Sequence, residues 1–368
     1  MTRALSQTSR PLQALVDLAA MTHNLAQARA RAGERPIWAV VKANAYGHGI
    51  ENAVRAFAAA DGLALLETDE AQRARAAGWR KPILLLEGVF ASRDFALVNE
   101  LDLTVVVHSM EQIEMLERLP AAAPVAIFLK IDTGMNRLGF PAALVPAARA
   151  RIAALPHVRV AALMTHLANA DREHGPAPTV QEQHAALQAL VPDWRGAWSV
   201  SNSAALFLHP SRGAESVRPG ITLYGASPAP GVSAASLGLQ AAMRLQARVL
   251  AVRDLAPGQC VGYGSLWTAA RPSRIGVVAC GYADGYPRAT PEGMPVWAGG
   301  RRVPLVGRVS MDMLTIDLSG VEGVEVGSPV ELWGRNIAVD ELAERVGTVG
   351  YELLSALPAR VREEVACD

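Results

Sequence analysis

Lysine is rare in this chain, and two of its lysines stand where an amine could do chemistry. Only three of the 35 Lys and Arg residues are lysines, at positions 42, 81 and 130. Lys42 and Lys130 end apolar runs, whereas Lys81 stands in a polar pair before Pro82. An amine differs from a guanidinium because it can lose its proton, act as a nucleophile and form a Schiff base. We therefore interpret at least one of the first two lysines as chemically required, and Lys81 as a chance survivor.

The composition is typical of a soluble globular enzyme. The chain has 368 residues, enough for two domains, with 51% hydrophobic and 19% charged residues. Its net charge is zero and it has no basic block, which argues against nucleic acid or an anionic membrane as a partner. No signal-like segment or membrane-span length of apolar residues is present, and we expect a cytoplasmic protein. The three cysteines, Cys260, Cys280 and Cys367, lack metal-ligand spacing, so we expect buried or idle thiols and no metal site.

Apolar runs alternate with alanine-rich helical patterns up to about residue 225. The runs cover residues 38–43, 63–66, 83–86, 103–107, 125–131, 158–164, 198–200 and 216–223, and helical patterns between them include 51–60, 111–119, 144–155 and 180–190. This alternation predicts an α/β fold, a parallel (β/α)₈ barrel. Active sites of such barrels gather at the C-terminal ends of the strands. The residues found at those ends are Lys42, Lys130, Arg137, His166, Asn202, Ser203, Arg218 and Gly220.

The sequence pattern changes after a loop-like linker at residues 226–236. Strand patterns follow at 245–252, 275–280, 295–298, 303–309, 314–318 and 330–333. Gly299-Gly300 is typical of a hairpin turn, and Asp340 could cap a short helix over 341–346. We predict a barrel domain over 1–235 and a smaller, mostly antiparallel β domain over 236–368.

Barrels of this kind often hold a phosphate group after strands 7 and 8. A Schiff-base lysine together with such a phosphate site indicates pyridoxal phosphate. Segments in order along nearly the whole chain resemble those of the alanine racemase family. They are Ala39-Val-Val-Lys42-Ala-Asn-Ala-Tyr46-Gly-His-Gly, Lys130-Ile-Asp-Thr-Gly-Met-Asn-Arg137-Leu-Gly, Ser201-Asn202-Ser203-Ala, Val217-Arg218-Pro-Gly220-Ile221, Val261-Gly-Tyr263-Gly, Gly281-Tyr282-Ala-Asp-Gly-Tyr-Pro-Arg288, Gly307-Arg308-Val-Ser-Met311-Asp312 and Tyr351-Glu-Leu-Leu. The resemblance implies a homodimer in which the barrel of one chain and the β domain of its partner build each active site.

The resemblance also implies catalytic roles. Lys42 holds the cofactor as a Schiff-base aldimine and then acts as one base, and Tyr263 of the partner chain is the other. A tyrosine with a pKa near 10 needs cationic help to act as a base, which a relay through His166 and Arg218 could supply. Arg218 contacts the pyridine nitrogen, where an always-protonated guanidinium makes a weaker electron sink than a carboxylate would. A satisfied core histidine and a surface arginine are the alternatives for His166 and Arg218.

Binding roles follow from the same resemblance. The hydroxyls of Tyr46, Ser203 and Tyr351 and the amides of Gly220 and Ile221 hold the phosphate, and His166 and Asn202 also contact the cofactor. Arg137 and the partner's Met311 amide hold the substrate carboxylate, for which the arginine fork is suited. Tyr282, Arg288, Arg308 and Asp171 resemble residues that line the access corridor. Carbamylation of Lys130 is implied as well, and chance retention is its alternative.

We therefore predict a racemase that interconverts L- and D-alanine by a two-base mechanism, for peptidoglycan or for alanine catabolism. A broader-specificity amino-acid racemase is the close alternative, and the width of the pocket decides between the two. A single-barrel carrier of pyridoxal phosphate would lack the β domain and Tyr263. A barrel-type decarboxylase would need a glycine-run phosphate loop and a catalytic cysteine near the C-terminus, whereas Gly220 stands without such a run and Cys367 is the last residue but one.

Overall fold

The computed structural model describes residues 9–120, 124–172, 178–209 and 215–366. The chain forms two compact units. The barrel unit contains Met21–Leu223 and Ser227–Leu239, and the β unit contains Met1–Ala20, Tyr224–Ala226 and Gln240–Asp368. The chain passes between the units more than once, and the boundary that we predict between residues 235 and 236 stays a prediction.

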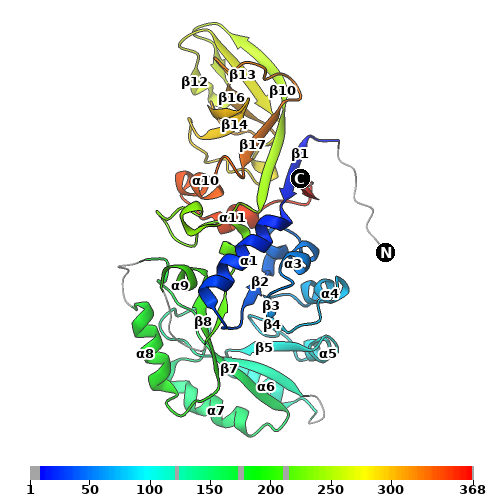
Figure 1. Cartoon of the computed structure of the whole chain (residues 1–368), viewed down its shortest axis with the longest axis vertical. Coiled ribbons are helices and arrows are strands. Elements are labelled where there is room, and N and C mark those ends of the chain that lie inside the picture. Colours follow the sequence, from blue (N-terminus) through cyan, green and yellow to red (C-terminus); the bar gives the residue numbers. More distant parts are fainter. Residues whose placement is uncertain (1–8, 121–123, 173–177, 210–214, 367–368) are drawn as a thin grey trace. The chain divides into compact units, whose positions relative to one another are not determined.

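The barrel unit confirms the parallel fold predicted from the apolar runs (Figure 1). Its strands are β2 (Trp38–Val40), β3 (Gly62–Leu65), β4 (Ile83–Leu85), β5 (Leu103–Val107), β6 (Val125–Lys130), β7 (Val158–Met164), β8 (Ala197–Asn202) and β9 (Ser216–Arg218). They pair in chain order, and each pairing is parallel. A parallel bridge between Ile37 and Val217 and a hydrogen bond from the Val40 amide to the Pro219 carbonyl (3.0 Å) connect the last strand to the first. The sheet is therefore closed.

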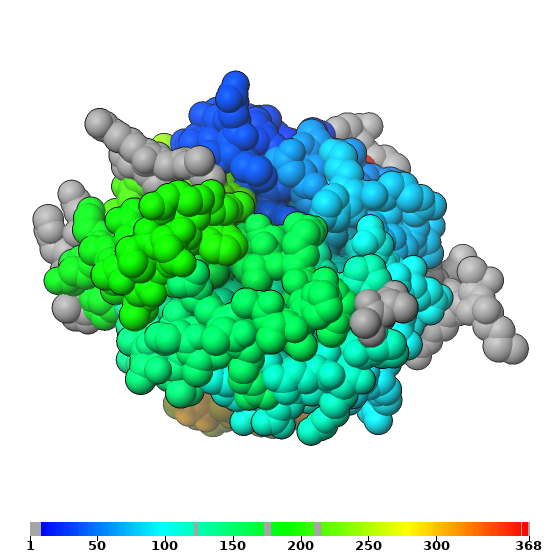
Figure 2. Space-filling model, turned by 90° about the horizontal axis from the view of Figure 1, so that it is seen from below, coloured from blue at the N-terminus to red at the C-terminus, as the bar shows by residue number. Residues whose placement is uncertain are grey.

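Helices connect the strands and lie around the sheet (Figure 1). They are α1 (Leu18–Ala32), α3 (Ile50–Ala56), α4 (Thr68–Ala76), α5 (Phe95–Glu100), α6 (Met110–Glu117), α7 (Val145–Ala153), α8 (Val180–Leu190) and α9 (Ser203–Leu208), with a short turn, α2 (Lys42–Tyr46), directly after β2. β3 and β4 are buried at every position, as expected for strands covered on both faces. Figure 2 shows one face of the molecule, on which atoms coloured blue to green cover most of the visible surface. The buried strands therefore hold their C-terminal ends, where the predicted site residues lie, in fixed positions.

The β unit is mostly antiparallel, as predicted. Its strands are β1 (Leu12–Val16), β10 (Met243–Leu255), β11 (Cys260–Val261), β12 (Trp267–Thr268), β13 (Ser273–Val278), β14 (Pro295–Ala298), β15 (Arg301–Pro304), β16 (Leu314–Asp317), β17 (Pro329–Trp333) and β18 (Arg362–Val365), and its helices are α10 (Val339–Val346) and α11 (Gly350–Ser355). Gly299 and Gly300 join β14 to β15 with φ values of 58° and 76°. Positive φ at both residues is the requirement of the commonest two-residue hairpin turn, so the hairpin prediction is confirmed.

Two local predictions in this unit are wrong. The run 303–309 is not one strand, because β15 ends at Pro304, which has no N–H to donate, and Gly307 has a φ of 69°. Asp340 does not cap its helix, because α10 begins at Val339 with Ala338 at the capping position. Asp340 instead lies in the first turn, where a negative charge is still favourable. β1 was not predicted; it pairs with β10 and β18.

The described residues contain two free cysteines, an exposed Cys260 and a buried Cys280, while Cys367 lies outside the described residues. Within the described ranges, no helix is both long and apolar enough to cross a membrane.

Candidate active site

Lys42 lies two residues after the end of β2 and begins an unusual turn. Ala43, Asn44, Ala45 and Tyr46 all have positive φ, between 51° and 55°. A left-handed turn of non-glycine residues is unfavourable, at about 1–2 kcal/mol per residue. Burial lowers the pKa of Lys42, the positive charge of Arg137 lowers it further, and the carboxylates of Glu87 and Glu70 oppose both effects. The amine can therefore lose its proton more readily than that of an ordinary lysine.

Lys130 ends β6 and is only 5% exposed. Burial lowers its pKa to about 8, with further lowering by Arg218 and Arg137. The exposed Arg137 lies on the loop after β6, where the Asp132 carboxylate accepts hydrogen bonds from the amides of Gly134 (2.9 Å) and Asn136 (3.1 Å). This local turn folds the loop back over the end of the strand.

His166 follows β7 and is surrounded by cations. Burial lowers its pKa well below the usual value, and the charges of Arg218, Lys130, Arg137 and Lys42 lower it further. The imidazole is therefore neutral at physiological pH. The same electrostatic contacts mean that the barrel brings these five predicted residues together at one end of the sheet, although they are far apart in the sequence.

Arg218 ends β9 and is fully enclosed by hydrogen-bond acceptors. Its guanidinium donates to the Ser199 hydroxyl (2.7 Å), to the carbonyls of Thr165 (2.8 Å) and Val200 (3.2 Å), and at 3.5 Å to Nδ1 of His166. Burial lowers the pKa of Arg218 to about 10, and the carboxylate of Glu215 partly offsets that effect. The guanidinium therefore stays charged at neutral pH in a fixed orientation.

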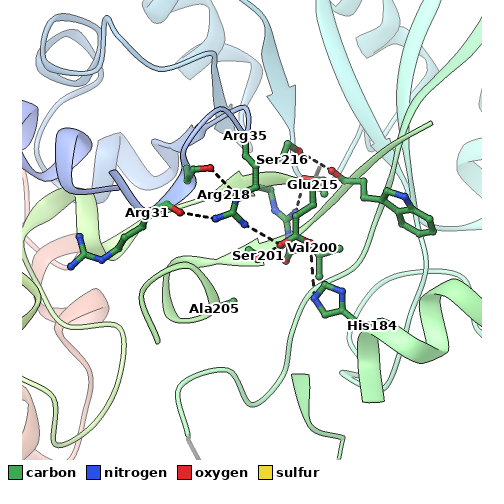
Figure 3. Close-up of polar contacts among 12 residues, drawn as sticks. Arg31, Arg35, His184, Val200, Ser201, Ala205, Glu215, Ser216 and Arg218 are labelled. Atoms are coloured by element: carbon green, nitrogen blue, oxygen red, sulfur yellow. Dashed lines mark hydrogen bonds and ion pairs between the residues drawn. The ribbon is translucent and has the colours of Figure 1, made fainter. Parts of the chain in front are cut away.

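A second buried polar cluster lies beside Arg218 (Figure 3). The Glu215 carboxylate accepts a hydrogen bond from Ser201, and it lies 3.6 Å from Nη1 of Arg35 and 4.0 Å from Nε2 of His184. A cavity of about 930 Å³ lies between α8 and β8 beside this cluster, and its described lining includes Glu215 and neither Lys42 nor Lys130. The cavity is therefore distinct from the predicted site.

Hydroxyl and amide groups converge where β8 and β9 end. The Gly220 amide donates to the Ser203 hydroxyl (2.8 Å), and the Thr222 hydroxyl also contacts Ser203 (3.2 Å). A Cβ atom added at Gly220 would lie 2.6 Å from the hydroxyl of Tyr46. Ile221 follows directly in a short 3₁₀ turn, and Asn202 caps α9 by accepting a hydrogen bond from the Ala205 amide (3.0 Å). The Gly220 amide and the hydroxyls of Ser203, Thr222 and Tyr46 therefore lie together, in what we call the cradle, and the Tyr46 hydroxyl can approach this closely because residue 220 is glycine.

The β unit carries a second group of predicted site residues. Tyr263 is 73% exposed and lies between Gly262 and Gly264, which both have a φ of 76°. A Cβ atom at Gly264 would lie 3.9 Å from Nη1 of Arg308. Met311 and Tyr282 are exposed as well, and amides of the Tyr282 turn donate to the carbonyls of Ser310 (3.0 Å) and Met311 (2.9 Å).

The remaining predicted residues are more loosely placed. Tyr351 lies partly exposed on α11, and Arg288 is exposed on a loop of the β unit. Asp171 lies half-buried in the barrel unit after β7.

Comparisons with known proteins identify the family of this chain. Residues 16–228 match a family model for the N-terminal domain of alanine racemase, and residues 242–365 match the model for its C-terminal domain. The chain belongs to the alanine racemase family. It is 50% identical over 353 residues to an alanine racemase of Janthinobacterium sp. (strain Marseille), covering 96% of this chain and 98% of that protein. An alanine racemase of Ralstonia nicotianae is 49% identical over 96% of this chain and 94% of its own length.

Solved structures of alanine racemases have the same fold as this chain. The crystal structure of a biosynthetic alanine racemase from Pseudomonas aeruginosa superimposes with a TM-score of 0.91 at 46% identity, covering 97% of this chain and 100% of that one. The alanine racemase of Acinetobacter baumannii gives a TM-score of 0.90 at 36% identity, with 97% and 100% covered.

The residues present fit the pyridoxal phosphate that the resemblance to alanine racemases implies. A lysine with a lowered pKa, a buried charged arginine and the cradle at Gly220 supply an amine, a donor for a ring nitrogen and donors for a phosphate. The described residues contain no group of three or more His, Cys, Asp or Glu side chains that could hold a metal ion.

Sequence reasoning missed several residues that position the predicted site residues. Buried Asp284 accepts hydrogen bonds from Arg10 (2.8 Å), Arg360 (2.7 Å) and the Gly281 amide (2.9 Å), and so fixes the turn that carries Tyr282. Glu70 and Glu87 act on the charge of Lys42. Asp284 stood within a quoted motif, but nothing in the sequence indicated its two arginine partners, which are 274 and 76 residues away.

Proposed function

We propose that this protein interconverts L- and D-alanine with pyridoxal phosphate covalently held by Lys42. The observation that carries the proposal is the convergence of Lys42, Lys130, Arg137, His166 and Arg218 at the C-terminal ends of barrel strands in a chain of this family. When bound, the cofactor supplies an electron sink that makes the α-proton of an amino acid acidic.

The residues of the barrel unit would hold the cofactor at both ends. Tyr46, Ser203 and the amides of Gly220 and Ile221 would bind its phosphate, assisted by Asn202. Arg218 would donate to its ring nitrogen. Arg218 is buried, stays protonated and is held by four acceptors, so it would keep that nitrogen unprotonated.

Two bases would move the proton on opposite faces of the substrate. Nζ of Lys42 would take the α-proton of D-alanine, which its lowered pKa supports. The Tyr263 hydroxyl of the partner subunit would take that of L-alanine, and its exposed position between two glycines supports a role outside its own unit. This division requires a homodimer with shared sites, and neutral His166 beside Arg218 would assist the tyrosine.

Substrate binding would rest on the carboxylate of alanine. Arg137 and the Met311 amide of the partner subunit would hold it, with Tyr282 at the access side. Carbamylation of Lys130 would turn a repelling cation beside Arg137 into an anion that orients it, and the pKa of about 8 supports reaction with CO₂. We expect the protein to act in the cytoplasm and to supply D-alanine for peptidoglycan or to degrade alanine.

The direct test is turnover of each alanine enantiomer in deuterated water, with product chirality and α-deuterium measured. We expect both directions to proceed and to bring deuterium into the product. A panel of other L-amino acids separates alanine racemisation from the broader-specificity alternative. Absence of turnover with alanine, by protein that contains the cofactor, would reject the proposal, and Lys42→Ala is the matched inactive control.

A further inference from the structure

The left-handed turn after Lys42 must be held by something other than its own residues. Ala43, Ala45 and Tyr46 have side chains that disfavour positive φ, and only Asn44 tolerates it well. The turn keeps internal hydrogen bonds from Ala45 to Val41 (2.8 Å) and from Gly47 to Ala43 (3.0 Å). Such bonds would form in a right-handed turn as well, so they do not explain the handedness.

Two side chains of α4 fix the centre of the turn. The Glu70 carboxylate accepts a hydrogen bond of 2.6 Å from the Asn44 amide, and Nη2 of Arg73 donates to Oδ1 of Asn44 (2.9 Å). Arg73 is itself held by both oxygens of Glu51, at 2.9 and 2.7 Å. The same Asn44 oxygen accepts a weaker bond from the Ile50 amide (3.3 Å). Both the amide and the side chain of Asn44 are therefore bound from outside the turn.

Glu70 is a buried acid, and its contact with Asn44 offers a reason for that burial. It is 6% exposed, and its Oε2 atom is buried without a hydrogen-bond partner among the described residues. A buried carboxyl group with an unsatisfied oxygen is destabilising unless its other contacts compensate. The one described hydrogen bond that this carboxylate makes within the barrel unit is to the Lys42 turn.

We propose that Glu70 and Arg73 are positioning residues for Lys42, which hold Asn44 and thereby keep the turn left-handed so that the lysine amine faces the site. The inference rests on the proposed role of Lys42. It predicts that the hydrogen-bond acceptor at position 70 is needed rather than its negative charge.

The test combines amide hydrogen exchange of the full chain with steady-state kinetics for alanine. In Glu70→Ala, peptides covering residues 41–50 should exchange about tenfold faster or more, because the lost bond raises the population of the opened turn. Peptides covering β5 should be unchanged. The kcat for alanine should fall by a similar factor with little change in KM, because Lys42 would act in the chemical step.

Two variants separate positioning from charge and from general destabilisation. Glu70→Gln keeps an oxygen acceptor and should stay within about threefold of the unmodified protein in exchange and in kcat. Ala43→Gly, added to Glu70→Ala, should slow the exchange of the turn and raise kcat, both toward the values of the unmodified protein. The reason is that glycine adopts positive φ without a steric penalty. Glu331→Ala is the matched control: Glu331 is also buried and accepts a backbone amide bond, from Asn336 (2.7 Å), but it lies in the β unit.

Several outcomes would overturn the inference. They are unchanged exchange of the turn in Glu70→Ala, an equal defect in Glu70→Gln, failure of Ala43→Gly to slow the exchange, or a loosened turn with normal kcat. If Glu70→Ala does not fold, Arg73→Met is the alternative: it leaves the Glu70 bond in place and removes the bond to the Asn44 side chain together with the ion pair to Glu51. It should give the same pattern, less strongly, and unchanged exchange of the turn in that variant would also reject the inference. An unmodified protein without racemase activity would refute the proposed function, while the exchange data would still decide whether Glu70 holds the turn.

Discussion

The burial of Lys130 gives a quantitative prediction for folding stability. Burial lowers its pKa to about 8 from an ordinary 10.5, with Arg218 and Arg137 adding to the effect. That difference corresponds to about 3 kcal/mol. Because the pKa is lower in the folded than in the unfolded protein, the protonated amine destabilises the folded state at every pH below about 8. The contribution of Lys130 to the free energy of unfolding then rises with pH between about 8 and 10.5, where only the unfolded chain keeps this proton.

Lys130→Met removes the amine and keeps a long, unbranched side chain. In CO₂-free buffer near neutral pH, this variant should be more stable than the unmodified protein by up to about 3 kcal/mol, and the advantage should vanish above about pH 10.5. Denaturant unfolding followed by circular dichroism measures the difference. Exposed Lys81, replaced in the same way, is the matched control.

Carbamylation of Lys130 should reverse the difference in stability between Lys130→Met and the unmodified protein. With bicarbonate present, an anionic carbamate on Lys130 would be stabilised by the neighbouring arginines, so bicarbonate should stabilise the unmodified protein and not Lys130→Met. Lys130→Arg should raise KM for alanine, because it keeps a cation beside Arg137. The reasoning is refuted if Lys130→Met is the less stable protein in CO₂-free neutral buffer and bicarbonate has no differential effect.

Three further predictions concern the rest of the site. Tyr263→Phe should keep the cofactor and largely abolish racemisation, while solvent exchange of the α-proton persists mainly from D-alanine; equal loss from both enantiomers would contradict the division between the two bases. Mixed and re-associated Lys42→Ala and Tyr263→Phe chains should regain partial activity through one intact site per dimer, and no recovery despite confirmed subunit exchange would locate both bases in one chain. Gly220→Ala should weaken cofactor binding about tenfold or more, because its Cβ would lie 2.6 Å from the Tyr46 hydroxyl, and equilibrium dialysis that gives normal affinity would exclude a tight cradle there.

The barrel was predictable because its strands are buried on both faces and therefore form continuous apolar runs. The short β9, Ser216–Arg218, has a weaker signal in the sequence, because Arg218 and Gly220 interrupt the apolar run over residues 216–223. Lys42, Lys130 and Arg218 stood out because a charged residue at the end of an apolar run is unusual. These residues can therefore be recognised from their immediate neighbours in the sequence.

The parts that were missed depend on contacts between distant segments. β1 has an ordinary amphipathic pattern and becomes a strand because β10 and β18 pair with it. Asp284 and Glu70 resemble surface acids in the sequence, and only the fold buries them beside their partners. The left-handed turn at residues 43–46 was also not predictable, because two of its residues are alanines, which favour right-handed helices.

The central claim is that Lys42 carries the cofactor of a racemase. Borohydride reduction of the purified protein, followed by peptide mapping, tests it most directly, because reduction makes a cofactor–lysine linkage permanent. The account predicts one adduct per chain, on Lys42, and loss of the visible absorbance on reduction. An adduct on Lys81 or Lys130, or no adduct in protein that turns over alanine, would contradict it.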